Sequence, residues 1–361
     1  EYDGFYIQAR TVRAYPHKIL ANTLGYLGEI SSEQLQQPGK ENYRPGDYIG
    51  ISGLEYQYED SLRGRSGVRW IIVDVKGVEK GSFKGGLYDT LYVAGKDLIT
   101  TLDFELQQFA EKLMVNKIGS IVAIEPSSGE ILTIVSKPAY DPNLLTGRTF
   151  PKNFALLEKD TLAPLFNRPI MAMYPPGSIF KIVQALIGLQ EGAIHPNTWF
   201  SCNLNILNCH KHPSPNNLYG GIKYSCNPYF FNVFRKIINQ KRSDNIYEGA
   251  ATGLNKWREH ILSFGFGEKL GVDLLDEKKG LIPSVEDYNK IYGKGHWLFS
   301  TIYSLSIGQG EILITPLQMA NIAVIVANKG HYYTPHLINA IGKESAGDNS
   351  INSNTNKLSQ Q

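Results

Sequence analysis

Residues 174–181 have the sequence Tyr-Pro-Pro-Gly-Ser-Ile-Phe-Lys. The prolines and Gly177 end an extended segment and allow a helix to begin at Ser178. Residues three apart share one face of a helix, so we expect Ser178 and Lys181 to point into the same cleft. A serine attacks only when a base removes its proton, and a lysine is that base only when burial or a neighbouring cation lowers its pKa. The stretch therefore predicts a nucleophilic serine with a lysine base.

The same stretch also fits a simpler structure. A serine before a helix is a common N-cap and a lysine one turn later is usually solvated, so Ser-x-x-Lys alone is a weak signal. The approach through Pro175, Pro176 and Gly177 favours the functional interpretation. The helix N-terminus also offers free N–H groups, one of which could help to hold an oxyanion.

A second motif lies at residues 224–228, with the sequence Tyr-Ser-Cys-Asn-Pro. Pro228 suits the first position of a helix, which leaves Ser225 and Asn227 in the loop before it. There the hydroxyl can relay a proton and the amide can bind a peptide-like carbonyl. Taken alone, Asn227 also fits the N-cap of the following helix.

The chain around these motifs predicts an α+β domain in which helices pack against an antiparallel sheet. Apolar runs at residues 120–124 and 131–135 flank the turn sequence Pro-Ser-Ser-Gly at 126–129, the pattern of a β-hairpin. A helix is expected over residues 101–117. Its apolar face comprises Leu102, Leu106, Phe109 and Leu113.

Four helices are expected from the serine onward. The first begins at Ser178, and its apolar stripe comprises Ile179, Ile182, Val183 and Leu186. The next two cover residues 228–240 and 257–264. The fourth covers residues 315–328, with a threonine able to cap it and a proline at its first position.

Three parts are expected along the chain. Residues 1–98 contain short strand-like runs at 68–75 and 87–93 and predict a β-rich, non-catalytic domain, with one helical piece at 31–37. Residues 99–342 make the α+β domain. Residues 343–361 are rich in Ser, Asn and Gln and predict a flexible loop or tail.

The composition sets broad limits. With 42% hydrophobic and 19% charged residues, the 361-residue chain is typical of a globular protein. A net charge of +2 does not favour nucleic acid as a partner. The sequence contains no apolar run of about 18 residues, so it predicts no membrane-spanning helix. Because the chain starts with Glu-Tyr-Asp and not with Met, we expect an excerpt whose natural N-terminus is missing.

Three cysteines and a histidine could hold a metal. The hypothesis is a structural Zn²⁺ bound by Cys202, Cys209, His212 and Cys226. The spacing matches no standard zinc template, and Cys226 lies inside the second motif. Buried free cysteines and a loop histidine pair are the alternative, and an odd number of cysteines excludes complete internal disulfide pairing.

The order of the two motifs, Ser-x-x-Lys and then Ser-x-Asn, resembles that of penicillin-binding proteins and serine β-lactamases. Further segments resemble class B penicillin-binding proteins, and most of all the elongation-specific subgroup, penicillin-binding protein 2. They are residues 11–16, 53–55, 62–67, 100–103, 140–143, 167–169, 265–267, 308–310 and 315–316. The likeness extends over about residues 5–340.

The resemblance implies a function. It implies a D,D-transpeptidase that cross-links peptidoglycan stem peptides through an acyl-enzyme on Ser178, with Lys181, Ser225 and Asn227 as the other catalytic residues and no cofactor in the reaction. It also implies acylation by β-lactams, a cytoplasmic-membrane anchor with an extracytoplasmic catalytic part, and a membrane-embedded glycosyltransferase partner.

One family motif is missing from this sequence. No Lys-Thr-Gly or Lys-Ser-Gly follows Asn227, although the family uses it to grip the substrate carboxylate. We therefore expect residues 1–361 alone to be catalytically impaired. Two other functions stay open: a serine β-lactamase, which the long first domain disfavours, and a β-lactam sensor or non-catalytic scaffold.

Overall fold

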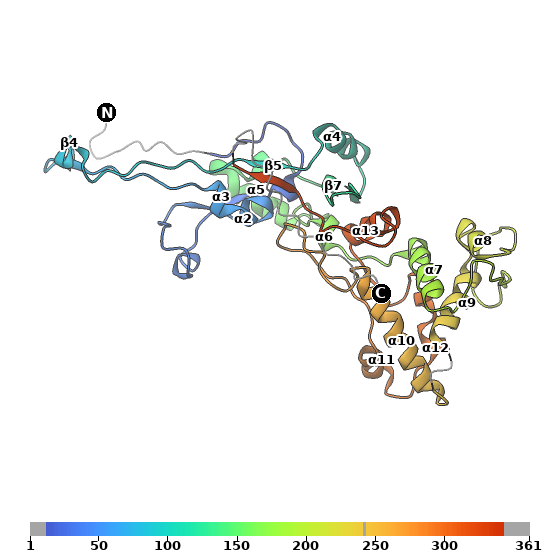
Figure 1. The fold of residues 1–361 in the computed structure, drawn as a ribbon. Helices are drawn as coiled ribbons and strands as arrows, with labels where there is room; N and C mark the ends of the chain where they lie inside the picture. The colour runs from blue at the N-terminus through green and yellow to red at the C-terminus, as the bar shows by residue number, and fades with distance from the viewer. Residues whose placement is uncertain (1–11, 241–242, 343–361) are drawn as a thin grey trace.

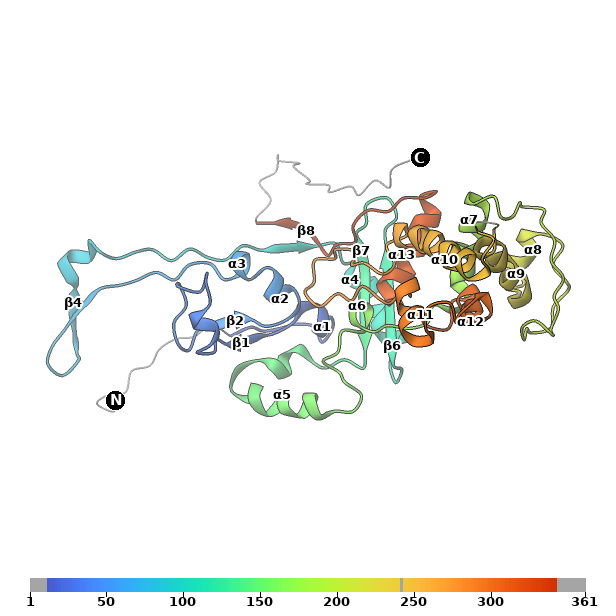
Figure 2. The same cartoon turned by 90° about the horizontal axis from the view of Figure 1, so that it is seen from below.

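The computed structural model describes residues 12–240 and 243–342, so the predicted tail at 343–361 lies outside the described residues. The molecule is elongated: a thin arm carrying β4 extends from one end, and the helices α7 to α12 form the other (Figures 1 and 2). Within the described ranges, no helix is both long and apolar enough to cross a membrane.

The N-terminal part is built from short elements. β1 pairs with β2 and β3 with β4, both antiparallel. The elements are α1 (Ala21–Leu24), β1 (Leu27–Glu29), η1 (Gln34–Gln36), β2 (Tyr48–Gly50), α2 (Gly53–Gln57), α3 (Glu59–Leu62), β3 (Ile71–Val73), β4 (Glu79–Ser82) and η2 (Phe83–Gly86). The helical piece expected at 31–37 is thus only a single 3₁₀ turn.

The arm formed by residues 65–93 corrects another expectation. The strand predicted at 87–93 does not form; this run pairs only at isolated bridges, Thr90 with Val68 and Val93 with Arg65. Among the described residues, no second layer of structure packs on the arm, so its apolar side chains stay exposed, with Leu91 91% and Val75 fully accessible. A two-stranded ribbon without a packed face is marginal by itself.

The hairpin predicted in the next part is confirmed. β6 (Gly119–Ile124) and β7 (Ile131–Lys137) pair antiparallel around the turn at 126–129. A second antiparallel pair joins β5 (Leu98–Thr100) to β8 (Ile338–Ile341), which lie more than 230 residues apart in the sequence. With the helices on these strands, the predicted α+β class is confirmed.

Helix α4 (Phe104–Leu113) forms as predicted, but the face that packs is different. Phe109 and Leu113 are about half exposed, whereas Gln107, Ala110 and Glu111 are buried against β7. The Gln107 amide explains this orientation. Its Oε1 accepts from the Ile134 N–H at 2.9 Å, and its Nε2 donates to the Ile134 carbonyl at 3.1 Å. A buried side-chain amide therefore aligns the helix with the strand, in place of an apolar stripe.

The remaining helices build the core at the far end of the molecule. It includes fully buried aromatic rings from α7, α9 and α10. The helices are α5 (Phe150–Lys159), α6 (Arg168–Met171), α7 (Phe180–Gln190), α8 (Leu218–Lys223), α9 (Asn227–Ile238), α10 (Ile246–Ser263), α11 (Val285–Tyr292), α12 (Phe299–Ile302) and α13 (Pro316–Ala327). Short 3₁₀ turns complete the elements: η3 (Pro142–Leu145), η4 (Gly147–Thr149), η5 (Gly177–Ile179) and η6 (Tyr303–Ile307).

The α13 prediction is confirmed, and Thr315 caps the helix as expected, in a capping box with Gln318 that was not predicted from the sequence. The stripe predicted on α7 is partly wrong. Val183 is buried, but Ile179 and Leu186 are about 40% exposed. The chain enters α7 through the tighter η5 turn, which rotates the following residues relative to a continuous α-helix.

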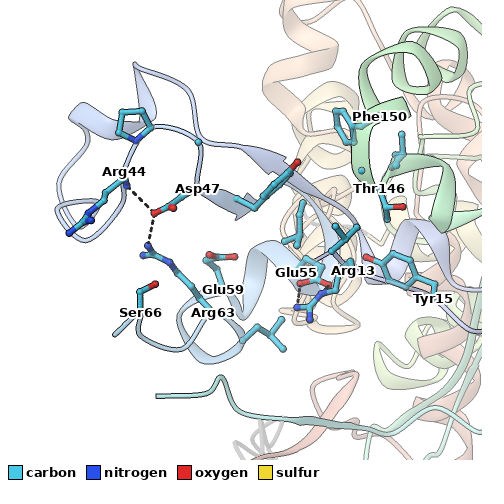
Figure 3. A pocket seen from close by; sticks show the side chains of 18 residues that line it. Arg13, Tyr15, Arg44, Asp47, Glu55, Glu59, Arg63, Ser66, Thr146 and Phe150 are labelled. Atoms are coloured by element: carbon cyan, nitrogen blue, oxygen red, sulfur yellow. Dashed lines mark hydrogen bonds and ion pairs between the residues drawn. The ribbon is translucent and has the colours of Figure 1, made fainter. Parts of the chain in front are cut away.

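The two halves of the chain meet through specific polar contacts. The Tyr58 hydroxyl donates to Asp273 at 3.0 Å, and the Leu20 N–H donates to Glu111 at 3.0 Å. An open cavity of about 870 Å³ is lined by residues of the N-terminal part and by residues 145–147 and Phe150, and there Arg13 makes a two-pronged ion pair with Glu55 (Figure 3). No residue of the Ser-x-x-Lys or Ser-x-Asn motif lines this cavity.

Candidate active site

Ser178 lies in the η5 turn that leads into α7, and its side chain is exposed. The turn needs Gly177, which has φ +62°. It also needs Gly308, whose carbonyl accepts from the Gly177 N–H at 2.9 Å. A Cβ at Gly308 would lie 2.5 Å from the Gly177 oxygen and 2.7 Å from the Phe180 Cβ. The loop at 308–310 therefore sets the position of the nucleophile turn.

A backbone bridge fixes the segment before the turn. Tyr174 and Ile314 exchange two N–H···O bonds of 2.9 Å. The segment 308–314 thus holds the chain on both sides of the two prolines, which places Ser178 at a defined position.

Lys181 is the most unusual side chain of the site, because it is only 2% exposed. Its Nζ donates to the Ser225 carbonyl at 2.6 Å and to Asn227 Oδ1 at 2.6 Å, and lies 3.0 Å from Ser225 Oγ. The structure thus unites Lys181 with both polar residues of the second motif. The three hydrogen-bond partners of the amine are thus two atoms of Ser225 and one of Asn227, and Ser178 is not among them.

Burial lowers the pKa of Lys181 to about 8, against an opposing electrostatic influence of Cys209 and Cys226. A neutral amine has two N–H groups and one lone pair. The Ser225 carbonyl and Asn227 Oδ1 can only accept, so they take the two N–H groups. The lone pair is then available to a hydroxyl, which is what a general base requires.

The Ser-x-Asn turn has a strained backbone. Ser225 has φ +48°, in the left-handed region that a residue with a Cβ seldom adopts. Asn227 is the first residue of α9 and not a loop residue, and Cys226 occupies the N-cap position. The alternative in which Asn227 caps α9 is wrong, because its Oδ1 contacts Lys181 and its Nδ2 donates to the Asn208 carbonyl at 2.8 Å.

The four candidate metal ligands lie together beside this turn. The sulfur atoms of Cys202, Cys209 and Cys226 and a ring nitrogen of His212 all lie within 4.8 Å of one another. His212 Nε2 lies 3.2 Å from Cys209 Sγ and 3.5 Å from Cys202 Sγ. Its Nδ1 lies 2.7 Å from the Pro213 carbonyl, the orientation seen when imidazole binds a metal through the other nitrogen.

The thiols of this cluster differ in acidity. Burial raises the pKa of Cys226 to about 12 and also raises that of Cys202. Burial acts the same way on Cys209, but the N–H of Asn227 and the His212 ring outweigh it and lower the Cys209 pKa. The Asn227 N–H lies 3.4 Å from Cys209 Sγ, so the cluster contacts the Ser-x-Asn turn directly.

Sequence reasoning assigned no role here to Asn208 or Gly308. Asn208 acts through its backbone carbonyl, for which a sequence carries no signal. Gly308 was visible only as part of a resembling segment, and its role depends on the close approach of a distant loop.

Two family models match the chain. The penicillin-binding protein transpeptidase domain matches residues 119–361, and the penicillin-binding protein dimerisation domain matches residues 1–100. This chain belongs to the penicillin-binding protein transpeptidase family. The resemblance predicted from the motifs is confirmed.

Curated relatives agree with this assignment. The chain is 32% identical to the peptidoglycan D,D-transpeptidase MrdA of Acinetobacter baumannii, over 94% of this chain and 49% of that protein. It is 31% identical to MrdA of Escherichia coli strain K12, over 93% of this chain and 52% of that protein. The chain thus spans about half the length of the curated relatives it matches.

Solved structures share the fold. A complex between penicillin-binding protein 2 and MreC from Helicobacter pylori superposes with a TM-score of 0.75 at 28% identity, over 92% of this chain and 61% of that one. Penicillin-binding protein 2 of Pseudomonas aeruginosa in complex with WCK 5153 gives 0.71 at 29% identity, over 95% and 71%.

The role of Gly308 gives a testable prediction. Gly308→Ala should lower the melting temperature by several degrees more than Gly295→Ala, because a Cβ at 308 meets backbone atoms and one at 295 meets none within 4 Å. Both glycines have positive φ, +69° and +83°, so backbone strain is matched. Thermal unfolding measures the difference, and equal melting temperatures would contradict the account.

Proposed function

We propose that this protein is a peptidoglycan D,D-transpeptidase in which Ser178 is the nucleophile and Lys181 the general base. The observation that carries the proposal is the buried Lys181 amine, held by Ser225 and Asn227 with its pKa lowered to about 8. The names of the MrdA relatives support the same reaction.

The first half of the reaction forms the acyl-enzyme. Neutral Lys181 accepts the proton of the Ser178 hydroxyl, and Oγ attacks the penultimate carbonyl of a stem peptide that ends in D-Ala-D-Ala. The tetrahedral oxyanion collapses, and the peptide bond to the terminal D-Ala breaks. The departing nitrogen takes a proton through the Ser225 hydroxyl, which lies 3.0 Å from Lys181 Nζ.

The second half transfers the acyl group. The amine of a second stem peptide attacks the Ser178 ester, its proton passes to the Ser225–Lys181 pair, and Ser178 regains a hydroxyl proton. Asn227 holds the substrate peptide near the lysine during both halves. A β-lactam follows only the first half. Its amide bond lies in a ring, so the leaving nitrogen stays attached to the acyl group and blocks the place of the acceptor amine.

We place the catalytic part outside the cytoplasmic membrane, as the substrate requires, and assign it a protein partner. The exposed apolar arm supports a partner, since Trp70, Ile72 and Leu91 are 55%, 47% and 91% exposed. Two structural neighbours come from the complex with MreC and from work on a peptidoglycan synthase complex. The proposed partner is a membrane-embedded glycosyltransferase or its assembly.

The nucleophile is tested by intact-protein mass spectrometry. Full-length protein incubated with benzylpenicillin should gain the mass of one ligand and keep it, whereas Ser178→Ala should gain none. Ser304→Ala, a serine in the nearby η6 turn, is the matched control and should still react.

Other outcomes select other functions. No adduct on folded wild-type protein would contradict the proposal and favour a non-catalytic scaffold. Catalytic turnover of benzylpenicillin without a lasting adduct would favour a β-lactamase.

A structural Zn²⁺ is a second proposal, supported by the cluster of Cys202, Cys209, His212 and Cys226. Three sulfurs and one imidazole are a standard zinc ligand set, and a tetrahedral site spaces its sulfurs about 3.8 Å apart. Ligand atoms within 4.8 Å therefore need only a small contraction. The ion would tie the loop at 202–212 to the start of α9 and leave the acyl chemistry to other residues.

Metal analysis tests this proposal. Full-length protein purified without chelator should contain about one zinc per chain, and His212→Ala should contain far less. His210→Ala is the control, because His210 lies in the same loop but outside the cluster. Zinc well below one per chain in wild-type protein, after growth with added zinc, would contradict the proposal.

A further inference from the structure

The loop between α7 and α8 is closed on itself and attached at both ends. The Leu218 N–H donates to the Pro196 carbonyl at 3.0 Å, and the Cys202 N–H donates to Ser214 Oγ at 3.3 Å. From α9, the Tyr229 hydroxyl donates to the Thr198 carbonyl at 2.8 Å. The loop is therefore a fixed body and not a free connection.

This loop contacts the residues on both sides of Ser225. Before it, the Tyr224 ring stacks on the His212 ring, with centroids 5.5 Å apart and planes at 12°. After it, Asn227 donates from Nδ2 to the Asn208 carbonyl and from its backbone N–H to Cys209 Sγ. Ser225 itself is thus held between two contacts to a single loop.

The contacts to Asn227 decide how its amide faces. The Asn208 carbonyl can only accept, so it must face Nδ2, which leaves Oδ1 toward Lys181. An amide turned by 180° would lose both bonds.

The contact to Tyr224 bears on the strained residue. A left-handed conformation is unfavourable for a non-glycine residue and persists only when its surroundings impose it. The Ser225 N–H donates to the Ile222 carbonyl at 2.9 Å and the Cys226 N–H donates to the Gly221 carbonyl at 3.0 Å, so the end of α8 imposes part of this conformation. The stacked ring of Tyr224, directly before Ser225, and the bonded Asn227, two residues after it, hold the chain on either side. This conformation directs both the carbonyl and the hydroxyl of Ser225 at Lys181.

We propose that Tyr224 is a positioning residue for the reaction, because its ring, stacked on His212, acts with the backbone bonds at the end of α8 to keep Ser225 in the conformation that serves Lys181. The inference rests on the proposed function and adds to it a residue that does not itself contact Lys181. The flat ring matters and the phenol hydroxyl does not, since stacking uses the ring face. The Lys223 ammonium, 5.6 Å from the Tyr224 ring centre, covers the same ring.

The test measures acylation by a fluorescent penicillin in stopped flow, on full-length protein, resolving the acylation rate constant from the dissociation constant of the non-covalent complex. Tyr224→Ala should reduce the rate constant by roughly 10- to 100-fold, the scale of effect when a catalytic group is displaced by about 1 Å. The dissociation constant should change by less than about threefold. Tyr224→Phe should retain wild-type values.

Tyr219→Ala is the matched control, because Tyr219 is 71% exposed on the neighbouring α8 and should be dispensable. Where Tyr224→Ala does not fold, Tyr224→Leu removes the flat ring while keeping apolar volume. Zinc content is measured on each variant.

Several outcomes would overturn the inference. The first is an unchanged acylation rate constant in Tyr224→Ala. The second is weaker non-covalent binding with an unchanged rate constant, which would make the ring a substrate contact. The third is an equal fall of the rate constant in Tyr224→Phe. Loss of zinc together with activity would show that the ring acts through metal retention. Wild-type protein that is not acylated would instead remove the proposed function itself.

Discussion

The site depends on one buried ammonium group, that of Lys181. A lysine that is 2% exposed loses hydration that only hydrogen bonds can offset, and the two Ser225 atoms and Asn227 Oδ1 supply them. The same burial that makes the site costly lowers the pKa to about 8 and makes the amine usable as a base. The tight approach of Gly308 sets the turn that carries Ser178, and the strained Ser225 supplies two of the three partners of the amine.

The loop at 198–217 links the fold to this chemistry. It holds three of the four candidate zinc ligands, and three of its residues, Asn208, Cys209 and His212, contact the Ser-x-Asn turn. The candidate zinc cluster and the orientation of the Asn227 amide therefore depend on the same loop. This explains physically why a cysteine stands between the serine and the asparagine of the motif: Cys226 is fully buried and faces the cluster, while its two neighbours face Lys181.

Local chemistry was predictable from the sequence where short-range rules decide. The helix from Pro316 has its cap, its proline and its capping box within four residues, and the β6–β7 hairpin has its turn between two apolar runs. That Lys181, Ser225 and Asn227 belong to one site was predictable only from the order of the two motifs, which resembles that of the family. The grouping of the four metal ligands was also expected from residue types, although their spacing fits no template.

Long-range geometry was not predictable. Periodicity placed Phe109 of α4 in the core, but the Gln107 amide binds the edge of β7 and turns that ring to the surface. Asn227 was predicted to lie in the loop before the helix, but it is the first residue of α9. Its side chain bonds Lys181 and Asn208, so Cys226 occupies the N-cap position.

The most direct test of the account is an NMR titration of the Lys181 side chain in full-length protein, assigned with Lys181→Arg. The account predicts a pKa near 8, with the cation below that pH and the neutral base above it; a pKa above about 10, the ordinary range of lysine, would contradict it.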